Sequence, residues 1–362
     1  MSDVRAKHAG ALKVATVVGA RPQFIKAFPL SRALRAIEGI AEIAIHTGQH
    51  FDSNMSDIFF SELEMPPPDY QLGIHGGGQG SMTGRMLGAI EDVLIKERPH
   101  VVVVYGDTNS TVAAALAASK LHIPVAHVEA GLRSFNKRMP EEINRIVADH
   151  LSTLLLCPTT TAITNLSREG INSGVEKTGD LMFDATRIGI EMAARKSSIL
   201  DTLALASRKY AVATIHRAEN TDEPSNLQRV FSYLADLAQG QMIVMPLHPR
   251  TKNALATAQI DLTATGIKLI EPVGFLDMCQ LLHHASAVYT DSGGVQKEAY
   301  FHQVPCVTLR SETEWVETIS HGWNRLWNSD EYAPRTTIDE YGDGHAALQI
   351  AKSIVRMATN RS

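Results

Sequence analysis

Cysteine is scarce in this sequence, with only three residues in a chain of 362. Cys157, Cys279 and Cys306 lie far apart, so they show neither the spacing of a metal site nor a disulfide framework. So few cysteines are typical of a protein from a reducing compartment, and we expect a cytoplasmic location. The polar start, MSDVRAKHAGALK, lacks the apolar core of a signal peptide, and no apolar run is long enough to span a membrane. We therefore expect no membrane partner.

An excess of positive charge is also missing. The chain has 34 Lys and Arg residues against 39 Asp and Glu residues, which gives a net charge of −5 and a pI near 6.3. Because no basic stripe stands out, the sequence argues against a nucleic-acid partner. An anionic ligand would have to be held by a few individually placed Arg and Lys side chains and by backbone N–H groups.

Strand-like and helix-like segments alternate along the whole chain. HVVVVYGD at 100–107 reads as a buried strand, and the Ala-rich STVAAALAASKL at 110–121 reads as the helix that follows it. The same rhythm restarts with YAVATIH at 210–216. This alternation, in a chain long enough for two domains, predicts an α/β fold with two parallel sheets and a ligand site in a cleft between the domains.

The expected domain boundary lies near GDLMFDA, where a glycine precedes a helix. We therefore predict an N-terminal domain of residues 1–180 and a C-terminal domain of residues 181–345. Residues 346–362 form a last helix, which we expect to pack back on the N-terminal domain.

The stretch DSGGVQKEA at 291–299 places two glycines between a short buried strand and a helix. Backbone N–H groups at a helix start bind anions, and glycine allows a ligand to approach closely. Ser292, Gly293 and Gly294 are therefore candidates to hold phosphate, and Glu298, one turn further on, could accept hydrogen bonds from a ribose. An ordinary helix start with tolerated glycines fits the same letters.

The first strand ends in GARPQFIK, a second turn suited to phosphate. Arg21 and Lys26 flank this helix start, and Pro22 suits the first helical position. No Walker or dinucleotide glycine fingerprint is present, so the sequence carries no kinase or dehydrogenase signature.

Three carboxylates of the N-terminal half follow strands or open a helix. Asp107 and Glu129 each come directly after a buried strand, and Glu141 lies in the first turn of a helix that begins at Pro140. Neighbouring carboxylates push their pKa values apart, which suits one as a base and another as an acid. A helix cap for Asp107, and helix-dipole stabilisation with an ion pair to Arg145 for Glu141, are the alternatives.

In the C-terminal half, two strands end in histidine followed by arginine. TIHR places His216, and LHPR places His248, at a strand end. His216 could carry a proton or neutralise a diphosphate. No HExxH, CxxC or closely spaced acidic triad occurs, so we expect no metal and no other cofactor.

Taken in order, the motifs GARPQFIK, YGDTNST, HVEAGLRS, PEEINR, TIHRAEN, LHPR and DSGGVQKEA resemble the non-hydrolysing UDP-N-acetylglucosamine 2-epimerase family over nearly the whole chain. The resemblance implies two Rossmann-like domains in a GT-B-like arrangement. It implies inversion at C2 of a UDP-2-acetamido sugar, through a 2-acetamidoglucal, without metal or nicotinamide. It also implies a homodimer whose product, UDP-N-acetylmannosamine or a relative, feeds surface polysaccharide.

The resemblance also assigns roles residue by residue. The positions that match the family's catalytic groups are Asp107, Glu129, Glu141 and His216. The positions that match its substrate and UDP contacts are Arg21, Lys26, Arg145, His248, Ser292, Gly293, Gly294 and Glu298.

Two departures from the family pattern point to one branch. Gln23 stands where many members have glutamate, and SFNKRMPEE precedes the helix of Glu141. Both resemble epimerases of UDP-2,3-diacetamido-2,3-dideoxyglucuronate, in which case Lys137 or Arg138 could meet the sugar carboxylate. QHFDSNM at 49–55 and IHGGGQGS at 74–81 lack the charged residues of members with an activating second substrate site, so we predict no such activation.

Three rival functions fit the same architecture. A nucleotide-sugar glycosyltransferase needs the same nucleotide contacts but also an acceptor site, and a hydrolysing epimerase would release the free sugar. A silent nucleotide-sugar binding protein would not need the three carboxylates. Those carboxylates favour proton chemistry on the donor sugar itself.

Overall fold

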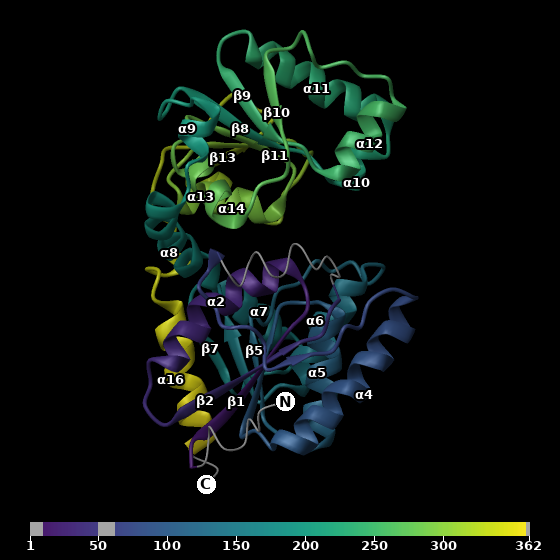
Figure 1. The fold of residues 1–362 in the computed structure, drawn as a ribbon, viewed down its shortest axis with the longest axis vertical. Coiled ribbons are helices and arrows are strands. Elements are labelled where there is room, and N and C mark those ends of the chain that lie inside the picture. Colours follow the sequence, from purple (N-terminus) through teal and green to yellow (C-terminus); the bar gives the residue numbers. More distant parts are fainter. Residues whose placement is uncertain (1–9, 50–61, 360–362) are drawn as a thin grey trace. The chain divides into compact units, whose positions relative to one another are not determined.

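The computed structural model describes residues 10–49 and 62–359 (Figure 1). Contacts within the chain divide it into two compact units. The N-terminal unit comprises Met1–Ala185 and Asp339–Ser362, and the C-terminal unit comprises Thr186–Ile338. The chain passes from the first to the second within helix α8 (Leu181–Lys196). The sequence predicted this passage near residue 180 and the return to the N-terminal domain at residue 346.

The N-terminal unit alternates strands and helices. Its elements are β1 (Leu12–Val18), α2 (Arg21–Arg35), β2 (Ile40–His46), β3 (Tyr70–Gln71), α4 (Gln79–Glu97), β4 (Val101–Tyr105), α5 (Asn109–Lys120), β5 (Val125–Val128), α6 (Pro140–Leu151), β6 (Leu154–Cys157), α7 (Thr160–Arg168), β7 (Val175–Lys177), η1 (Asp339–Tyr341) and α16 (Ala346–Thr359).

All seven strands of this unit pair in parallel, in the order β3-β2-β1-β4-β5-β6-β7. The chain winds outward in one direction from β1 and in the other from β4. The order therefore reverses between β1 and β4, and ligands of such sheets bind beyond the carboxyl ends of the strands at this switch point. The turns after β1 and β4 carry GARPQ and GDTNS.

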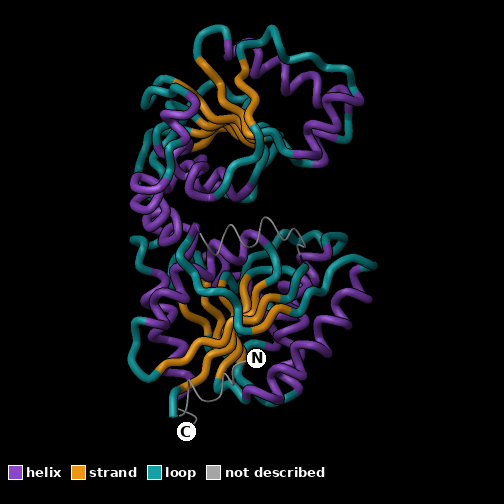
Figure 2. Tube along the Cα trace, in the orientation of Figure 1, coloured by secondary structure: helices purple, strands orange, loops and turns teal. Residues whose placement is uncertain are grey.

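Helices cover both faces of the N-terminal sheet (Figure 2). The four valines of β4 are fully buried, two in each core, because their side chains alternate between the faces. On one face α2 and α16 pack together, with Leu34 and Ile354 in the same core. On the other face the alanines of α5 let the helix approach the sheet closely. The last helix thus joins the N-terminal core.

The C-terminal unit repeats the alternation. Beyond α8 its elements are α9 (Ile199–Leu203), β8 (Tyr210–Thr214), α10 (Ala218–Thr221), α11 (Pro224–Ala238), β9 (Met242–Pro246), α12 (Pro249–Thr257), β10 (Ile267–Ile270), α13 (Phe275–His283), β11 (Val288–Thr290), α14 (Gly293–Phe301), β12 (Cys306–Thr308), α15 (Val316–Ser320) and β13 (Asn324–Leu326).

Its six strands are also parallel, in the order β10-β9-β8-β11-β12-β13. Here the order reverses between β8 and β11, whose last residues, Thr214 and Thr290, pair in register and share a hydroxyl hydrogen bond of 2.6 Å. The turns beyond them carry IHRAE and DSGG. The predicted α/β class with two Rossmann-like, parallel-sheet units is confirmed.

Candidate functional site

A buried glutamine joins the two turns at the N-terminal switch point. The Oε1 of Gln23 accepts hydrogen bonds from the N–H groups of Gly19 (2.8 Å) and Ala20 (3.1 Å). Its Nε2 donates to the carbonyl of Tyr105 at 2.7 Å and to the hydroxyl of Thr108. A glutamate at this position could accept the first pair of bonds but could not, when ionised, donate to a carbonyl. Glutamine in place of the glutamate of many family members therefore allows residue 23 to join the turn after β1 to the turn after β4.

Lys26 of α2 forms an ion pair with Glu129, the residue directly after β5. Burial works against the charged amine, but the adjacent Glu129 carboxylate outweighs it and raises the pKa of Lys26 above its ordinary value. Glu129 itself adopts a φ of +67°, a left-handed conformation that is costly for a residue with a side chain. Such conformations cluster at functional sites.

Asp107, just beyond β4, accepts a hydrogen bond from Nη2 of Arg145 on α6. The Nη1 of the same guanidinium donates to Glu142 at 2.9 Å. The Asp107 side chain keeps 31% of its surface exposed, so its carboxylate is oriented yet open to a ligand. Since β4 and β5 are hydrogen-bonded neighbours, Asp107 and Glu129 follow adjacent strand ends.

The two adjacent glutamates of α6 have different environments. Glu142 is buried, and its carboxylate accepts from the N–H groups of Ser134 and Phe135, both at 2.9 Å. It thereby fixes the loop before α6. Glu141 is exposed, and among the described residues its carboxylate makes no hydrogen bond or ion pair. The catalytic role that the motif match assigns to Glu141 stays a prediction.

We expect the stabilising effect of Glu142 to depend on pH. Burial opposes its charge, but the hydrogen bonds from Ser134 and Arg145 outweigh burial and lower the pKa of Glu142. A lowered pKa in the folded state adds stability above the ordinary carboxyl pKa, and this stability is lost as pH falls through the folded value. The difference in unfolding free energy between wild type and Glu142→Gln should therefore shrink in acid, measured by denaturant titration at several pH values. The exposed neighbour provides the control, Glu141→Gln. A difference that stays constant with pH would contradict this account.

A buried aspartate joins the turns after β8 and β11 at the C-terminal switch point. Asp291, fully buried after β11, accepts from the N–H groups of His216 (3.1 Å) and Arg217 (3.0 Å), both just beyond β8. It also accepts from the side-chain amide of Asn220 at 3.1 Å. The DSGG turn and the HR turn are thus held as one assembly.

His216 lies beside His248, with ring centroids 5.3 Å apart. Burial lowers the pKa of His216, and the neighbouring His248, Arg217 and Arg250 act in the same direction, against the opposing effect of Asp291. The His216 ring is therefore biased toward its neutral form. The ring of His248 accepts the N–H of Arg250 and so caps α12.

The predicted phosphate turn opens α14, with Ser292 as the N-cap residue. A Cβ on Gly293 would collide with the carboxylate of Glu314, whereas one on Gly294 would lie 3.8 Å from Oε1 of Glu298. Glu298 therefore reaches back toward the start of its own helix.

Sequence reasoning missed the charges that surround this turn. Glu314 forms ion pairs with Arg310 at 2.8 Å and with Arg217 at 3.8 Å. The Glu314 carboxylate itself thus lies at the helix start, where negative charge is stabilised, and neutralises the two arginines around it. Arg310 and Glu314 stand in the loop RSETEW, whose letters alone carry no such signal.

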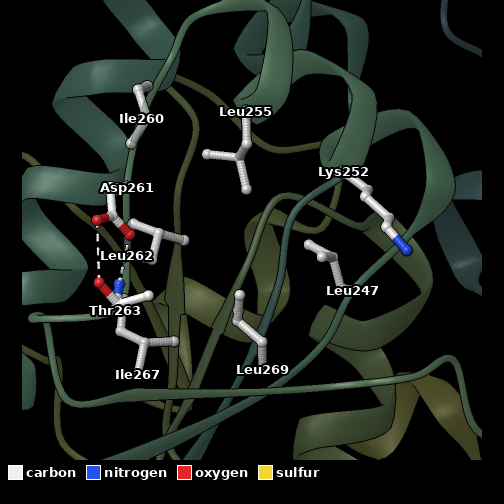
Figure 3. Close-up of a pocket in the computed structure, with 9 residues that line it drawn as sticks. All are labelled: Leu247, Lys252, Leu255, Ile260, Asp261, Leu262, Thr263, Ile267 and Leu269. Atoms are coloured by element: carbon white, nitrogen blue, oxygen red, sulfur yellow. Dashed lines mark hydrogen bonds between the residues drawn. The ribbon is translucent and has the colours of Figure 1, made fainter.

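A hollow of the C-terminal unit lies elsewhere, between α12 and β10 (Figure 3). It has a volume of about 430 Å³ and is lined mainly by Leu247, Leu255, Leu262 and Leu269. The carboxylate of Asp261 in this hollow is engaged by Thr263. None of the predicted site residues lines it.

Two predicted features lie outside the description. They are the side chain of Arg21, the first residue of α2, and residues 50–55 of the QHFDSNM motif. Within residues 10–49 and 62–359, no group of three or more His, Cys, Asp or Glu side chains is placed to hold a metal ion. No helix of the described part is both long and apolar enough to cross a membrane.

The model of the UDP-N-acetylglucosamine 2-epimerase family matches residues 32–355. The chain belongs to this family. The epimerase activity and the family resemblance predicted from the ordered motifs are confirmed, and a glycosyltransferase or silent binding protein is set aside.

Two relatives share 48% identity with this epimerase. One is a UDP-N-acetylglucosamine 2-epimerase homolog of Methanococcus maripaludis, covering 94% of this chain and 99% of its own. The other is the UDP-2,3-diacetamido-2,3-dideoxy-D-glucuronate 2-epimerase of Pseudomonas aeruginosa, covering 96% of this chain and 100% of its own.

Solved structures of the family share its fold. The Methanocaldococcus jannaschii UDP-GlcNAc 2-epimerase in complex with UDP-GlcNAc and UDP superposes with a TM-score of 0.84 at 40% identity, covering 95% of this chain and 99% of its own. The Neisseria meningitidis enzyme bound to UDP-GlcNAc superposes with a TM-score of 0.85 at 30% identity, covering 95% of this chain and 100% of its own. The roles of individual residues in this epimerase remain predictions.

Proposed function

We propose that this epimerase inverts C2 of UDP-N-acetylglucosamine to give UDP-N-acetylmannosamine, or acts likewise on a close UDP-2-acetamido sugar. The observation that carries the proposal is the pair of carboxylates at adjacent strand ends, Asp107 and Glu129, each oriented by a cation from another element. Exchange of a proton at both faces of one carbon requires two such acid/base groups. Glu141, exposed at the start of α6, is the third candidate.

In the proposed reaction a carboxylate removes the C2 proton while the C1–O bond to UDP breaks. The electron pair of the C–H bond becomes the C1–C2 double bond of a 2-acetamidoglucal. A proton is then delivered to the opposite face of C2, and a UDP oxygen forms the bond to C1 again. Atoms and electrons balance without an oxidant or a cofactor.

The departing UDP needs strong stabilisation of its charge. The N–H of Ser292 donates to the hydroxyl of Thr290 at 2.9 Å, so the Ser292 hydroxyl and the N–H groups of Gly293 and Gly294 would hold the diphosphate. Glu298 would hold the ribose. His216, biased toward its neutral form, would gain a proton and a hydrogen-bond partner when the diphosphate arrives. Further substrate contacts are proposed for Arg21, Lys26, Arg145 and His248.

A second candidate substrate is UDP-2,3-diacetamido-2,3-dideoxyglucuronate. The 48% identity with the Pseudomonas aeruginosa enzyme over 363 residues favours it. So do Lys137 and Arg138, two exposed cations in the loop that Glu142 fixes, because a uronate carries one more carboxylate than a plain sugar. We further propose a cytoplasmic homodimer whose product feeds surface polysaccharide, for which light scattering would test the dimer.

One experiment tests the proposed reaction directly. The protein is incubated with UDP-N-acetylglucosamine in D₂O, and C2 is followed by proton NMR, with the diacetamido uronate in a parallel sample. We expect deuterium at C2 and a second UDP-sugar in the sample that contains the true substrate. Retained C2–H with both substrates would refute the proposal, and release of free sugar would identify a hydrolysing enzyme.

A further inference from the structure

A buried charge network lies beneath the N-terminal switch point. His127 of β5 has no exposed surface, and both of its ring nitrogens are engaged. Its Nε2 lies 2.7 Å from the carbonyl oxygen of Gly106, and its Nδ1 lies 2.7 Å from Oδ1 of Asp149 on α6. None of the family motifs assigns this ring a role.

The partners determine the protonation of the ring. A carbonyl can only accept, so Nε2 must carry a hydrogen. Asp149 is also buried, and its Oδ2 accepts from the N–H of Gly131 at 3.2 Å and pairs with Arg133 at 2.7 Å. A carboxylate held by these donors is ionised, so Nδ1 carries a hydrogen as well. His127 is therefore an imidazolium, cationic although fully buried.

The acidities agree with this geometry. Burial opposes the charge on His127, but Asp149 outweighs burial and raises the pKa of the ring. Burial likewise opposes the charge on Asp149, but His127 and Arg133 lower the pKa of that carboxyl below its ordinary value. Arg133 is anchored in turn by two bonds of 2.7 Å to Glu169.

The hydrogen bond to Gly106 links this network to the proposed chemistry. Gly106 adopts a φ of +58°, and the next residue is Asp107. Its N–H donates to the carbonyl of Val128 at 3.0 Å, and the residue after Val128 is Glu129. A Cβ on Gly106 would lie only 3.3 Å from Oε2 of Glu129. The peptide that His127 holds therefore leads directly into Asp107, and Gly106 lies beside the Glu129 carboxylate.

We propose that His127 is a positioning residue, whose imidazolium, clamped between Asp149 and the Gly106 carbonyl, fixes the turn that presents Asp107 beside Glu129. The catalytic part of this inference rests on the proposed function of those two carboxylates. Asp149 and Arg133 support this role, since Arg133 pairs with the Asp149 carboxylate and that carboxylate stabilises the imidazolium. In this proposal, His127, Asp149 and Arg133 affect only the position of the two carboxylates and do not contact the substrate.

Two variants separate the hydrogen bond from the charge. His127→Gln can still donate to Gly106, but its amide oxygen then faces the Asp149 carboxylate, which repels it. Adding Asp149→Asn supplies a donor for that oxygen and removes the unpaired charge, so the double variant keeps both hydrogen bonds without ions. His150→Gln, an exposed histidine of α6, is the matched control.

The expected result is a kcat for His127→Gln that is lower by roughly 10²-fold, the cost of a misplacement near 1 Å, with KM and UDP affinity unchanged. The double variant should recover most of that loss. Where the single variant does not fold, the double variant carries the comparison. The inference would be overturned if folded His127→Gln had the kcat of the wild type. It would also be overturned if the kcat of the double variant were as low as the kcat expected for His127→Gln.

A second measurement does not depend on turnover. With ¹⁵N-labelled histidine, the ring nitrogens of His127 should both carry hydrogen through neutral pH, assigned by their loss in His127→Gln. The charged groups that act on the ring are Asp149 and Glu129. Arg133 and Cys157 interact with Asp149, and Lys26 pairs with Glu129. A single protonated nitrogen at neutral pH would refute the imidazolium. Absence of C2 exchange in the wild type would instead count against the proposed function alone.

Discussion

Replacing Asp107 by asparagine is expected to slow exchange of the C2 proton by roughly 10²–10⁴-fold, the usual contribution of a general acid or base. Asparagine has the same shape and can still accept the hydrogen bond from Arg145, so the turn after β4 should be preserved. It cannot accept a proton from carbon. UDP affinity should be nearly unchanged, because the contacts proposed for the diphosphate and the ribose, at Ser292–Gly294 and Glu298, lie on the C-terminal unit. Deuterium incorporation at C2 gives the rate, and titration calorimetry gives the affinity.

The matched control is Asp92→Asn, an exposed carboxylate on α4 of the same unit. It removes one negative charge without touching the switch point, so its rate should equal that of the wild type. A near-wild-type rate for Asp107→Asn would remove Asp107 from the proposed mechanism and leave Glu129 and Glu141 as the acid/base pair. A loss of UDP affinity would indicate instead that the substitution disturbs the fold.

The elements of the fold could be predicted because their signals are local. The run VVVVY fits only a strand buried on both faces, and the alanines that follow fit a helix packed closely on a sheet. The order of the strands could not be predicted, since β1 pairs with β4 across two intervening strands. Pairing of this kind depends on how separate segments meet, which no short window of residues records. The two switch points therefore appeared only in the structure.

The candidate site divides in the same way. Side chains at strand ends, such as Asp107 and His216, could be found because apolar runs end just before them. The side chains that hold those ends in place could not. Gln23 bonds to Tyr105, 82 residues away, and Asp291 bonds to His216, 75 residues away. Neither polar residue is recognisable as buried until its distant partners are known, because a buried polar group is stable only when it is paired.

Replacing Asp291 by alanine should both destabilise the C-terminal unit and weaken UDP binding. Three donors, from His216, Arg217 and Asn220, would lose their acceptor in a buried place. At about 1–3 kcal/mol for each unsatisfied donor, the free energy of unfolding should fall by roughly 3 kcal/mol or more. The HR turn would no longer be held against the DSGG turn, and even 1.4 kcal/mol of lost ordering lowers UDP affinity about tenfold.

Asp291→Asn provides a graded test, because an amide oxygen can still accept from Arg217 and Asn220 while the negative charge is lost. Its unfolding free energy and UDP affinity should fall between those of the wild type and Asp291→Ala, measured by denaturant titration and calorimetry. Asp236→Asn, which changes an exposed aspartate on α11 of the same unit, is the control and should change neither quantity. If Asp291→Asn folds stably and binds UDP as the wild type does, the carboxylate charge is not what holds the two turns together. Should Asp291→Ala also bind UDP normally, the phosphate turn would be formed by α14 alone.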